Sequence, residues 1–407
     1  MILSTRQDDE SAGTRNGVHG LHMSLPLPID GPSPDIPDVV DRPVLRASGP
    51  PEIVQLVPYL LGFHPRESLV MMAMRGRRIV VSVRYDLDAP IEIAEPWFRS
   101  ASNAGADHAV ALVYHDGITG PPLPMRDYVD QLGEQFAKHG LKEVDVIAVS
   151  DGRWWSYRCP SPKCCPPEGT PIDTAGAIAA SAVSEGMVAL PSRESLESEL
   201  EIDELAMCVV EAEIDKYLCD ELLKAVPDDG DAVDWPDAAQ VQVAQRAMRA
   251  TGWAEVRAFV KGARKGTKFT PPQAARVLVA LMDRSVRDAA IGYLVGPPDD
   301  NVGDAWRQLA RVAPVDLRAA PATLYALWCY AAGNGARSNI AIDVALEAEP
   351  DYAMAQILLD LMASGINPFE FIHDMATEAQ RVGRRIQRRR DPLGRRTQSA
   401  SQTAKGT

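Results

Sequence analysis

The sequence predicts an α/β fold, a mixed sheet with flanking helices, followed by an all-α helical array. In the first half, short apolar runs of strand length alternate with amphipathic patterns of helical length. From about residue 194 onward only helical patterns occur, and Gly and Pro residues separate them. These observations favour a sheet with right-handed helical crossovers, and then helix packed on helix.

Composition limits the classes of protein to which this chain of 407 residues can belong. Its hydrophobic content of 46% is ordinary for a globular protein, and its length allows two domains. The formal charge of -14 argues against nonspecific binding of the main body to nucleic acid or to an anionic membrane. The chain shows no transmembrane run, no apolar signal core and no disulfide scaffold. We therefore expect a cytoplasmic protein without a membrane partner.

Four segments follow from shifts in composition. Residues 1–43 are rich in Pro and Asp and are predicted to be disordered. Residues 44–190 are predicted to form the α/β domain with two hairpins, and residues 191–380 the helical domain. Residues 381–407 are predicted to be a disordered Arg-rich tail. Such a tail can bind nucleic acid, lie against acidic helices of its own chain or stay solvated.

The first hairpin is the best-defined local pattern. A helical pattern ends at Gly62, and Pro65 then biases the chain towards an extended conformation. Residues 69–74 form an apolar run typical of a strand buried on both faces, and Gly76 supplies the turn. Residues 81–87 alternate between apolar and polar side chains, as a second strand does.

Polar side chains gather where this hairpin begins and ends. His64, Arg66, Glu67 and Ser68 enter the first strand, while Arg84 and Asp86 leave the second, so all lie at one end of the hairpin. This cluster is a candidate binding site. The alternative is an exposed sheet edge with an Arg–carboxylate pair, which is a common and weak arrangement.

The remaining α/β elements follow in order. A helix is expected over residues 91–103 from near Pro96, a strand over 108–114, a helix over 125–139 and a strand over 144–149. Asp151-Gly152 is typical of a two-residue hairpin turn, after which residues 153–158 pair back. An Ala-rich helix is expected over residues 173–187, and Ser192 is placed as the N-cap of the next helix.

Residues 159–171, the cysteine loop, contain Cys159, Cys164 and Cys165 among five prolines. The spacing of Cys159 and Cys164 just meets the limit for a structural zinc site, but adjacent cysteines tend to point apart. We therefore expect a proline-braced turn with partly buried thiols, no cofactor and no stoichiometric zinc. Zinc coordination and a reactive thiol remain alternatives.

The second half is expected to be an irregular helical array. Residues 194–221 carry eleven acidic residues against Lys216, with an apolar stripe that includes Leu205, Val209 and Leu218. Residues 228–237 read as an acidic loop, and residues 241–367 as successive helices. Residues 324–350 resemble one tetratricopeptide-type helix pair, although a generic bundle explains them equally well. Such an array offers a surface for a protein partner.

Four motifs together resemble a known family. They are LLGFHPRESLV at residues 60–70, RYDL at 84–87, SYRCPSPKCCPPEGTP at 156–171 and PSRE at 191–194. On these the chain is similar to an actinobacterial family described only as domain of unknown function 4192, over about residues 50–368. The resemblance implies an intracellular bacterial protein and transfers no activity and no catalytic residue.

Two functions remain open from sequence. The first is a binding, regulatory or protein-interaction module. The second is an enzyme with a pocket at the hairpin mouth around His64, Glu67, Arg84 and Asp86 and the cysteine loop, where Cys164 or Cys165 would need His64 or His115 as base. The candidate binding residues are His64, Arg66, Glu67, Ser68, Arg84, Asp86, Tyr157, Glu168, Ser192 and Arg193.

Overall fold

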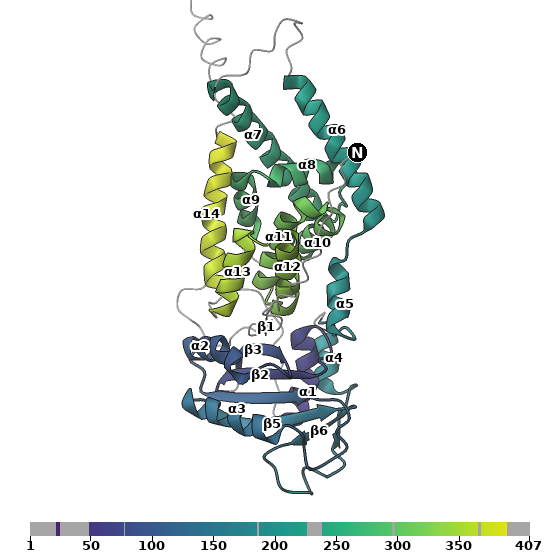
Figure 1. The fold of residues 1–407 in the computed structure, drawn as a ribbon, viewed down its shortest axis with the longest axis vertical. Coiled ribbons are helices and arrows are strands. Elements are labelled where there is room, and N and C mark those ends of the chain that lie inside the picture. Colours follow the sequence, from purple (N-terminus) through teal and green to yellow (C-terminus); the bar gives the residue numbers. More distant parts are fainter. Residues whose placement is uncertain are drawn as a thin grey trace, which may run out of the picture.

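The computed structural model describes residues 22–24, 49–76, 78–184, 187–225, 238–294, 298–364 and 368–388. A sheet with its flanking helices forms one end of the molecule, and an array of helices is stacked on it (Figure 1). The predicted fold class, a mixed sheet followed by a helical array, is confirmed.

The sheet has seven strands in the order β1-β3-β2-β4-β5-β6-β7. The hairpin strands β2 (Ser68–Arg75) and β3 (Arg78–Asp86) pair antiparallel, and β2 also runs antiparallel to β4 (His108–Tyr114). The strands β4 and β5 (Lys142–Ser150) are parallel, joined by the crossover helix α3 (Arg126–Lys138). One parallel pair within an otherwise antiparallel sheet makes the sheet mixed, as the sequence predicts.

Two tight turns set the geometry of the sheet. The helix α1 (Pro50–Leu61) ends at Gly62, whose φ of 80° is a left-handed conformation that favours glycine. Asp151 and Gly152 both have positive φ, at 46° and 74°, as a primed hairpin turn requires. They lead into β6 (Arg153–Ser156), and β7 (Thr170–Pro171) pairs with β6 at the sheet edge.

The two faces of the sheet belong to different apolar clusters. One face packs against α2 (Glu95–Asn103), its preceding 3-10 turn η1 (Ile91–Ala94), and α3, around the fully buried Trp97. The other face packs against α1, and its cluster continues into the helical array. Since that cluster includes Phe63 and Leu196, the sheet and the helices share apolar core rather than having wholly separate cores.

The helical array follows the short helix α4 (Ala177–Ser184). Its elements are α5 (Arg193–Glu197), η2 (Ser198–Leu200), α6 (Glu204–Ala225), α7 (Ala238–Ala263), α8 (Pro271–Leu281), α9 (Arg284–Ala290), η3 (Ile291–Leu294), α10 (Asp300–Val312), α11 (Val315–Ala331), α12 (Gly335–Ala348), α13 (Ala353–Ala363) and α14 (Pro368–Arg388). The predicted helix pair at residues 324–350 falls on α11 and α12, and its relation to a repeat stays a prediction.

Arginines of α10 and α12 hold residues 199–201, the segment that follows α5 within the helical array. The Arg337 guanidinium donates to both carboxylate oxygens of Glu199 at 2.7 and 2.9 Å. Arg307 donates to the carbonyl of Glu199 at 3.1 Å, and Arg311 to that of Glu201 at 3.1 Å. Bidentate and charge-assisted bonds of this kind fix the orientation of a segment. The predicted domain boundaries themselves remain predictions.

Three expectations are corrected. The predicted tail begins at residue 381, whereas α14 continues to Arg388 because Ile386 is buried and Gly383 lies against the ring of Trp253. Leu205 and Val209 of the expected apolar stripe are exposed on α6. The short strand β1 (His22–Ser24) lies within residues 1–43, which were predicted to be disordered, and pairs with β3.

Other predictions fall outside the described residues or are only partly covered by them. The acidic loop at residues 228–237 lies outside them, as do the last arginines of the tail. Nucleic-acid binding by those arginines stays a prediction. Within the part of the chain that the structure describes, none of the helices has the length and apolar character needed to cross a membrane.

Candidate functional site

The register of the strands gathers the predicted polar cluster at the carboxyl ends of the parallel strands. Ser68 lies opposite both Asp86 and Tyr114, so the mouth of the first hairpin meets the end of β4. In open α/β sheets, this edge is where ligands bind. Two adjoining cavities lie here, of about 560 Å³ and about 300 Å³, and His64, Arg66 and Asp116 line both.

The larger of the two cavities, the hairpin cavity, is lined by most of the predicted residues. Seven of the ten candidates line it, and Ser68 lies directly behind Arg84. The lining consists of Phe63, His64, Arg66, Glu67, Arg84, Asp86, Asp116, Ser192, Arg193 and Glu194. The structure therefore brings together residues that are separated by more than a hundred positions in the sequence.

Arg84 is the most deeply held charge of the hairpin cavity. It is 8% exposed, its Nε donates to the Ser68 hydroxyl at 2.8 Å, and its Nη1 lies 2.5 Å from an Asp86 carboxylate oxygen. Burial lowers the pKa of Arg84, and the Asp86 carboxylate opposes that shift. The paired guanidinium presents a fixed positive charge at the wall of the cavity.

A second group of charges separates the two cavities. The Arg66 guanidinium lies 2.5 Å from the Asp116 carboxylate, and both side chains are largely exposed. The backbone N–H of Asp116 donates to Glu67 Oε1 at 2.7 Å. Glu67 has a φ of 40°, a left-handed conformation that is uncommon outside glycine and that turns its carboxylate towards residue 116. Exposed pairs of this kind contribute little to stability and stay available to a ligand.

The smaller of the two cavities, the strand-end cavity, is lined by α1, by the ends of β4 and β5, and by residues 172–174. Tyr114 and Gln55 are among its lining residues, and the Tyr114 hydroxyl and the Gln55 amide oxygen are buried without a hydrogen-bond partner among the described residues. Tyr114 is 8% exposed, and burial raises the pKa of its hydroxyl. Buried polar atoms without a partner are uncommon in folded proteins, so both oxygens keep hydrogen-bonding capacity close to this cavity.

Two further carboxylates lie at the mouth of the strand-end cavity. Asp151 follows β5 and Asp173 follows β7. Asp173 accepts the backbone N–H of Ala175 at 3.1 Å, and Asp151 accepts the hydroxyl of Ser150 at 3.2 Å. Among the described residues, neither carboxylate forms an ion pair, in contrast to Asp86 and Asp116. The two therefore keep acceptor capacity for a cationic group.

His64 occupies the boundary between the cavities because its backbone is clamped. Its N–H donates to the carbonyl of Leu190 at 2.9 Å, and the N–H of Leu190 donates to the carbonyl of Gly62 at 2.8 Å. Burial lowers the pKa of His64 below its ordinary value of 6.5, so the imidazole is mostly neutral at pH 7. A neutral ring can donate or accept a single hydrogen bond to a ligand in either cavity.

Two candidate residues lie elsewhere. Tyr157 is 4% exposed, and its hydroxyl donates to the carbonyl of Pro124 at 2.8 Å, so it braces the loop before α3. Glu168 lies in the cysteine loop, where its carbonyl accepts from Arg153 at 3.2 Å. Neither lines the two cavities.

The cysteine loop leaves the sheet at the opposite end. Ser156, the last residue of β6, pairs with Ile147, and the N–H of Tyr157 donates to Val146, so the chain runs towards the amino end of β5. None of the three loop cysteines lines either cavity. The arrangement expected for the enzyme alternative, a loop cysteine beside His64 or His115, is therefore not formed.

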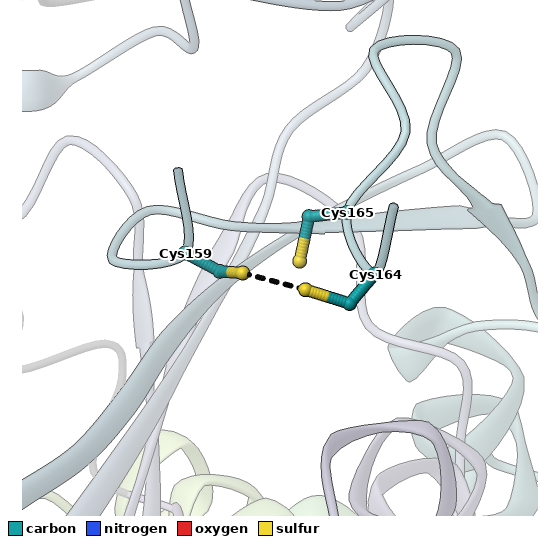
Figure 2. A group of neighbouring side chains, drawn as sticks. All are labelled: Cys159, Cys164 and Cys165. Carbon is teal, nitrogen blue, oxygen red and sulfur yellow. Dashed lines mark hydrogen bonds between the residues drawn. The ribbon is translucent and has the colours of Figure 1, made fainter. Parts of the chain in front are cut away.

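The expectation that the adjacent cysteines point apart is also wrong. Figure 2 shows that the side chains of Cys159, Cys164 and Cys165 point towards one another. Their sulfur atoms all lie within 4.8 Å of one another, and Cys159 Sγ is 3.0 Å from Cys164 Sγ. The hydrogen bond with the Cys164 thiol holds the pKa of Cys159 below its ordinary value.

Several residues of the cavities were missed from sequence. Tyr114 ends the predicted strand at residues 108–114, and Asp116 and Asp151 lie two residues after the predicted strands at 108–114 and 144–149. The rule that ligands gather at the carboxyl ends of parallel strands could have identified them. Gln55 and Asp173 carry no such signal, because helix packing and the return of the chain after β7 place them.

Comparison with known proteins gives one match. Residues 50–369 match the family described as Domain of unknown function (DUF4192). Neither the curated proteins nor the solved structures provide a match.

Proposed function

The chain belongs to the DUF4192 family, and we propose that it is a cytoplasmic binding protein for a small molecule that carries a protonated amine. The observation that carries this proposal is the strand-end cavity, which is lined by Asp151 and Asp173, two carboxylates without an ion-pair partner among the described residues. The volume of about 300 Å³ is at the lower end of the range for small-molecule sites.

The charge of the cavity supports an amine as the ligand's polar group. The carboxylates of Asp116, Asp151 and Asp173 line the cavity. Arg66 also lines it, and its positive charge is paired with Asp116. The two remaining carboxylates have no cationic partner among the described residues. A protonated amine between them would form charge-assisted hydrogen bonds, which are stronger than neutral ones.

The rest of the lining supports a ligand with an apolar body. The rings of Tyr59 and Tyr114 and the side chains of Val54, Val149 and Ile172 line the same cavity. An aromatic face also attracts a cation, which adds to the carboxylate contribution.

Binding of defined amines tests this proposal. The full chain is titrated by calorimetry with putrescine and spermidine, and with citrate as an anionic comparison. The double variant Asp151→Asn/Asp173→Asn should weaken amine binding at least about 10-fold, which corresponds to about 1.4 kcal/mol. The matched control is Glu211→Gln/Asp215→Asn, because both residues are exposed acids on α6.

The control separates specific binding from general attraction to an acidic protein. Equal loss in both double variants, or equal binding of amines and citrate, would contradict the proposal. The variant Tyr114→Phe adds a second measurement, since it removes one hydroxyl without changing charge. We expect it to weaken the same amine several-fold, because one unmade hydrogen bond contributes about 1 kcal/mol.

A second function, binding of a protein partner by the helical part, is favoured by α6. Leu205 is 85% exposed and Val209, one helical turn later, is 51% exposed. Exposed apolar side chains that adjoin on one helix face are typical of contact surfaces. Cross-linking with mass spectrometry, comparing the natural chain with Leu205→Ser/Val209→Ser, tests this: partner cross-links to α6 should disappear in the variant.

A further inference from the structure

Three thiols converge in the cysteine loop, at the opposite end of the sheet from the cavities (Figure 2). We propose that Cys159, Cys164 and Cys165 form a zinc site with three thiolate ligands and an open fourth position. Thiolates are ligands that zinc prefers, and three protein ligands with one exchangeable position are a recurrent arrangement for this ion. The site is separate from the proposed amine-binding cavity.

Backbone hydrogen bonds hold the loop in the converging conformation. The carbonyl of Ser161 accepts the N–H groups of both Cys164 and Cys165, at 3.2 and 2.8 Å. This tight turn carries both neighbouring side chains to the same side of the loop (Figure 2). The conformation of the loop therefore brings the sulfur atoms together, which lowers the cost of ordering the ligands when an ion binds.

The third ligand is held from the strand. The N–H of Cys159 donates to the Ser156 hydroxyl at 3.0 Å, and that hydroxyl donates to Asp145 Oδ1 at 2.7 Å. Ser156 ends β6, so Cys159 is fixed directly to the sheet. Cys159, which is tied to the end of β6, and Cys164 and Cys165, which are tied to the Ser161 carbonyl, thus approach from two differently supported segments.

The distances suit a tetrahedral ion after a small adjustment. A Zn–S bond of about 2.3 Å sets neighbouring sulfur atoms about 3.8 Å apart in tetrahedral coordination. The observed separations run from 3.0 Å for Cys159 and Cys164 up to no more than 4.8 Å across the cluster. Movements of about an ångström, within the reach of side-chain rotation, bring all three to bonding distance.

Apolar packing does not explain why these thiols converge. None of the three belongs to the apolar clusters, and Cys164 is exposed. Cys329, in contrast, is fully buried within an apolar cluster, as an inert cysteine is. A disulfide between Cys159 and Cys164 would account for two of the thiols and leave the position of Cys165 unexplained.

The coordination follows from the donors present. Among the described residues, the group of potential metal ligands here contains the three cysteines and no fourth His, Cys, Asp or Glu. Each thiol loses its proton to solvent when its sulfur binds the ion, so binding releases protons and weakens at low pH. The fourth position is left for water or for a ligand from outside the chain.

Metal titration of the full chain tests the proposal. The protein is stripped with a chelator under reducing conditions, and Zn²⁺ is then added in competition with a chromophoric chelator. We expect about one zinc per chain. Co²⁺ in place of Zn²⁺ should give a thiolate-to-cobalt charge-transfer band. Cys159→Ser, Cys164→Ser and Cys165→Ser should each weaken zinc binding by more than about 100-fold, beyond the loss typical of outer-shell changes.

The other cysteines provide matched controls. Cys208 and Cys219 are exposed on α6, so Cys208→Ser and Cys219→Ser should leave zinc affinity and the cobalt band unchanged. Circular dichroism verifies that each variant is folded. A chain that binds no zinc, equal affinity in loop and control variants, or a Cys159–Cys164 disulfide that persists in reductant would each overturn the proposal.

Discussion

The two ends of the sheet hold their polar groups in different ways. At the cavity end, charged side chains come from strand ends, and Arg84, Ser68 and Asp86 are linked to one another across the first hairpin. At the cysteine end, a proline-rich loop places three thiols through backbone hydrogen bonds to Ser156 and Ser161. The first arrangement follows from strand register, and the second from the path of a single loop.

This difference bears on what each end can bind. Strand ends are rigid, so the cavities are preformed and suit a small organic molecule. The cysteine loop carries soft ligands on a short segment whose closure a metal ion can complete. If both proposals hold, one sheet supports two chemically unrelated sites, and changes at one end should leave binding at the other unaffected.

The largest effect is expected where the cysteine loop returns to the sheet. Gly169 has a φ of 78°, and a Cβ there would lie 2.5 Å from the ring of Trp155. Gly169→Ala therefore combines left-handed strain with a steric overlap, and should lower the free energy of unfolding by about 2–5 kcal/mol in urea denaturation. It should also weaken zinc binding, because the loop can no longer close on β6.

Gly117 is the matched control for that substitution. Its φ is also 78°, but nothing lies within 4 Å of the position of a Cβ. Gly117→Ala should cost only about 1–2 kcal/mol, the strain alone. Equal losses in the two variants would show that the contact of Gly169 with Trp155 is not what anchors the loop.

The cavity end was the more predictable from sequence for a physical reason. The turn at Gly76 and the apolar run before it fix the register of the hairpin, and this register places Asp86 opposite Ser68 and brings the Arg84 side chain within reach of Ser68. The carboxyl ends of β4 and β5 follow from the same reasoning, although Tyr114 and Asp151 were not identified as lining residues. Strand periodicity thus determines both the fold class and much of this site.

The cysteine end could not be predicted in the same way. Whether Cys164 and Cys165 converge depends on the turn that the Ser161 carbonyl closes, and no periodic pattern encodes that turn. The exit of the second hairpin towards the amino end of β5 also separates these cysteines from His64. Similarly, the end of α14 depends on the packing of Ile386 in the helical array, which local composition does not reveal.

The next largest effect is expected on the rate at which trypsin cleaves the cysteine loop with and without zinc. Lys163 is exposed between Cys159 and Cys164, so trypsin can cut the loop after it. Zinc at ten times its dissociation constant should reduce the fraction of zinc-free loop, and hence the cleavage rate, about 11-fold. Mass spectrometry of the released peptides measures the rate at this bond.

Cleavage after Lys265 is the internal reference for that experiment. This residue is exposed in the turn after α7, in the helical array, and should be cut at the same rate with and without zinc. Slower cleavage at both bonds would indicate inhibition of trypsin. No change at either would mean that the cysteine loop stays open when zinc is present.

A smaller effect is expected for the buried arginine of the cavity end. Arg84→Met keeps much of the side-chain volume and removes the desolvation of a buried charge, and Asp86 is exposed enough to be hydrated. The free energy of unfolding should therefore change by less than about 1 kcal/mol, because the Asp86 carboxylate that remains is not a buried unpaired charge. Amine binding should change little as well, since Arg84 does not line the strand-end cavity.

Arg66→Met provides the comparison with an exposed pair, for which we expect no measurable change in the free energy of unfolding. A loss of more than about 3 kcal/mol in Arg84→Met would contradict the prediction. It would show that the Arg84–Asp86 pair holds the hairpin mouth together, in which case the charges at this end serve stability rather than binding.

The smallest expected effect is the pH dependence that His64 gives to the cavity end. Burial lowers its pKa in the folded protein below 6.5, so the unfolded chain binds the proton more tightly. The contribution is absent above about pH 6.5, and stability is lost as the pH falls from there through the folded pKa. Because the ring is partly solvated, the difference in the free energy of unfolding between the natural chain and His64→Gln should stay below about 0.5 kcal/mol, measured by urea denaturation at a series of pH values.

The opposite sign, a natural chain that gains stability over the variant as the pH falls, would mean that the charged imidazole is stabilised by a carboxylate such as Asp116. The cavity between them would then hold one more positive charge at low pH and bind amines less tightly.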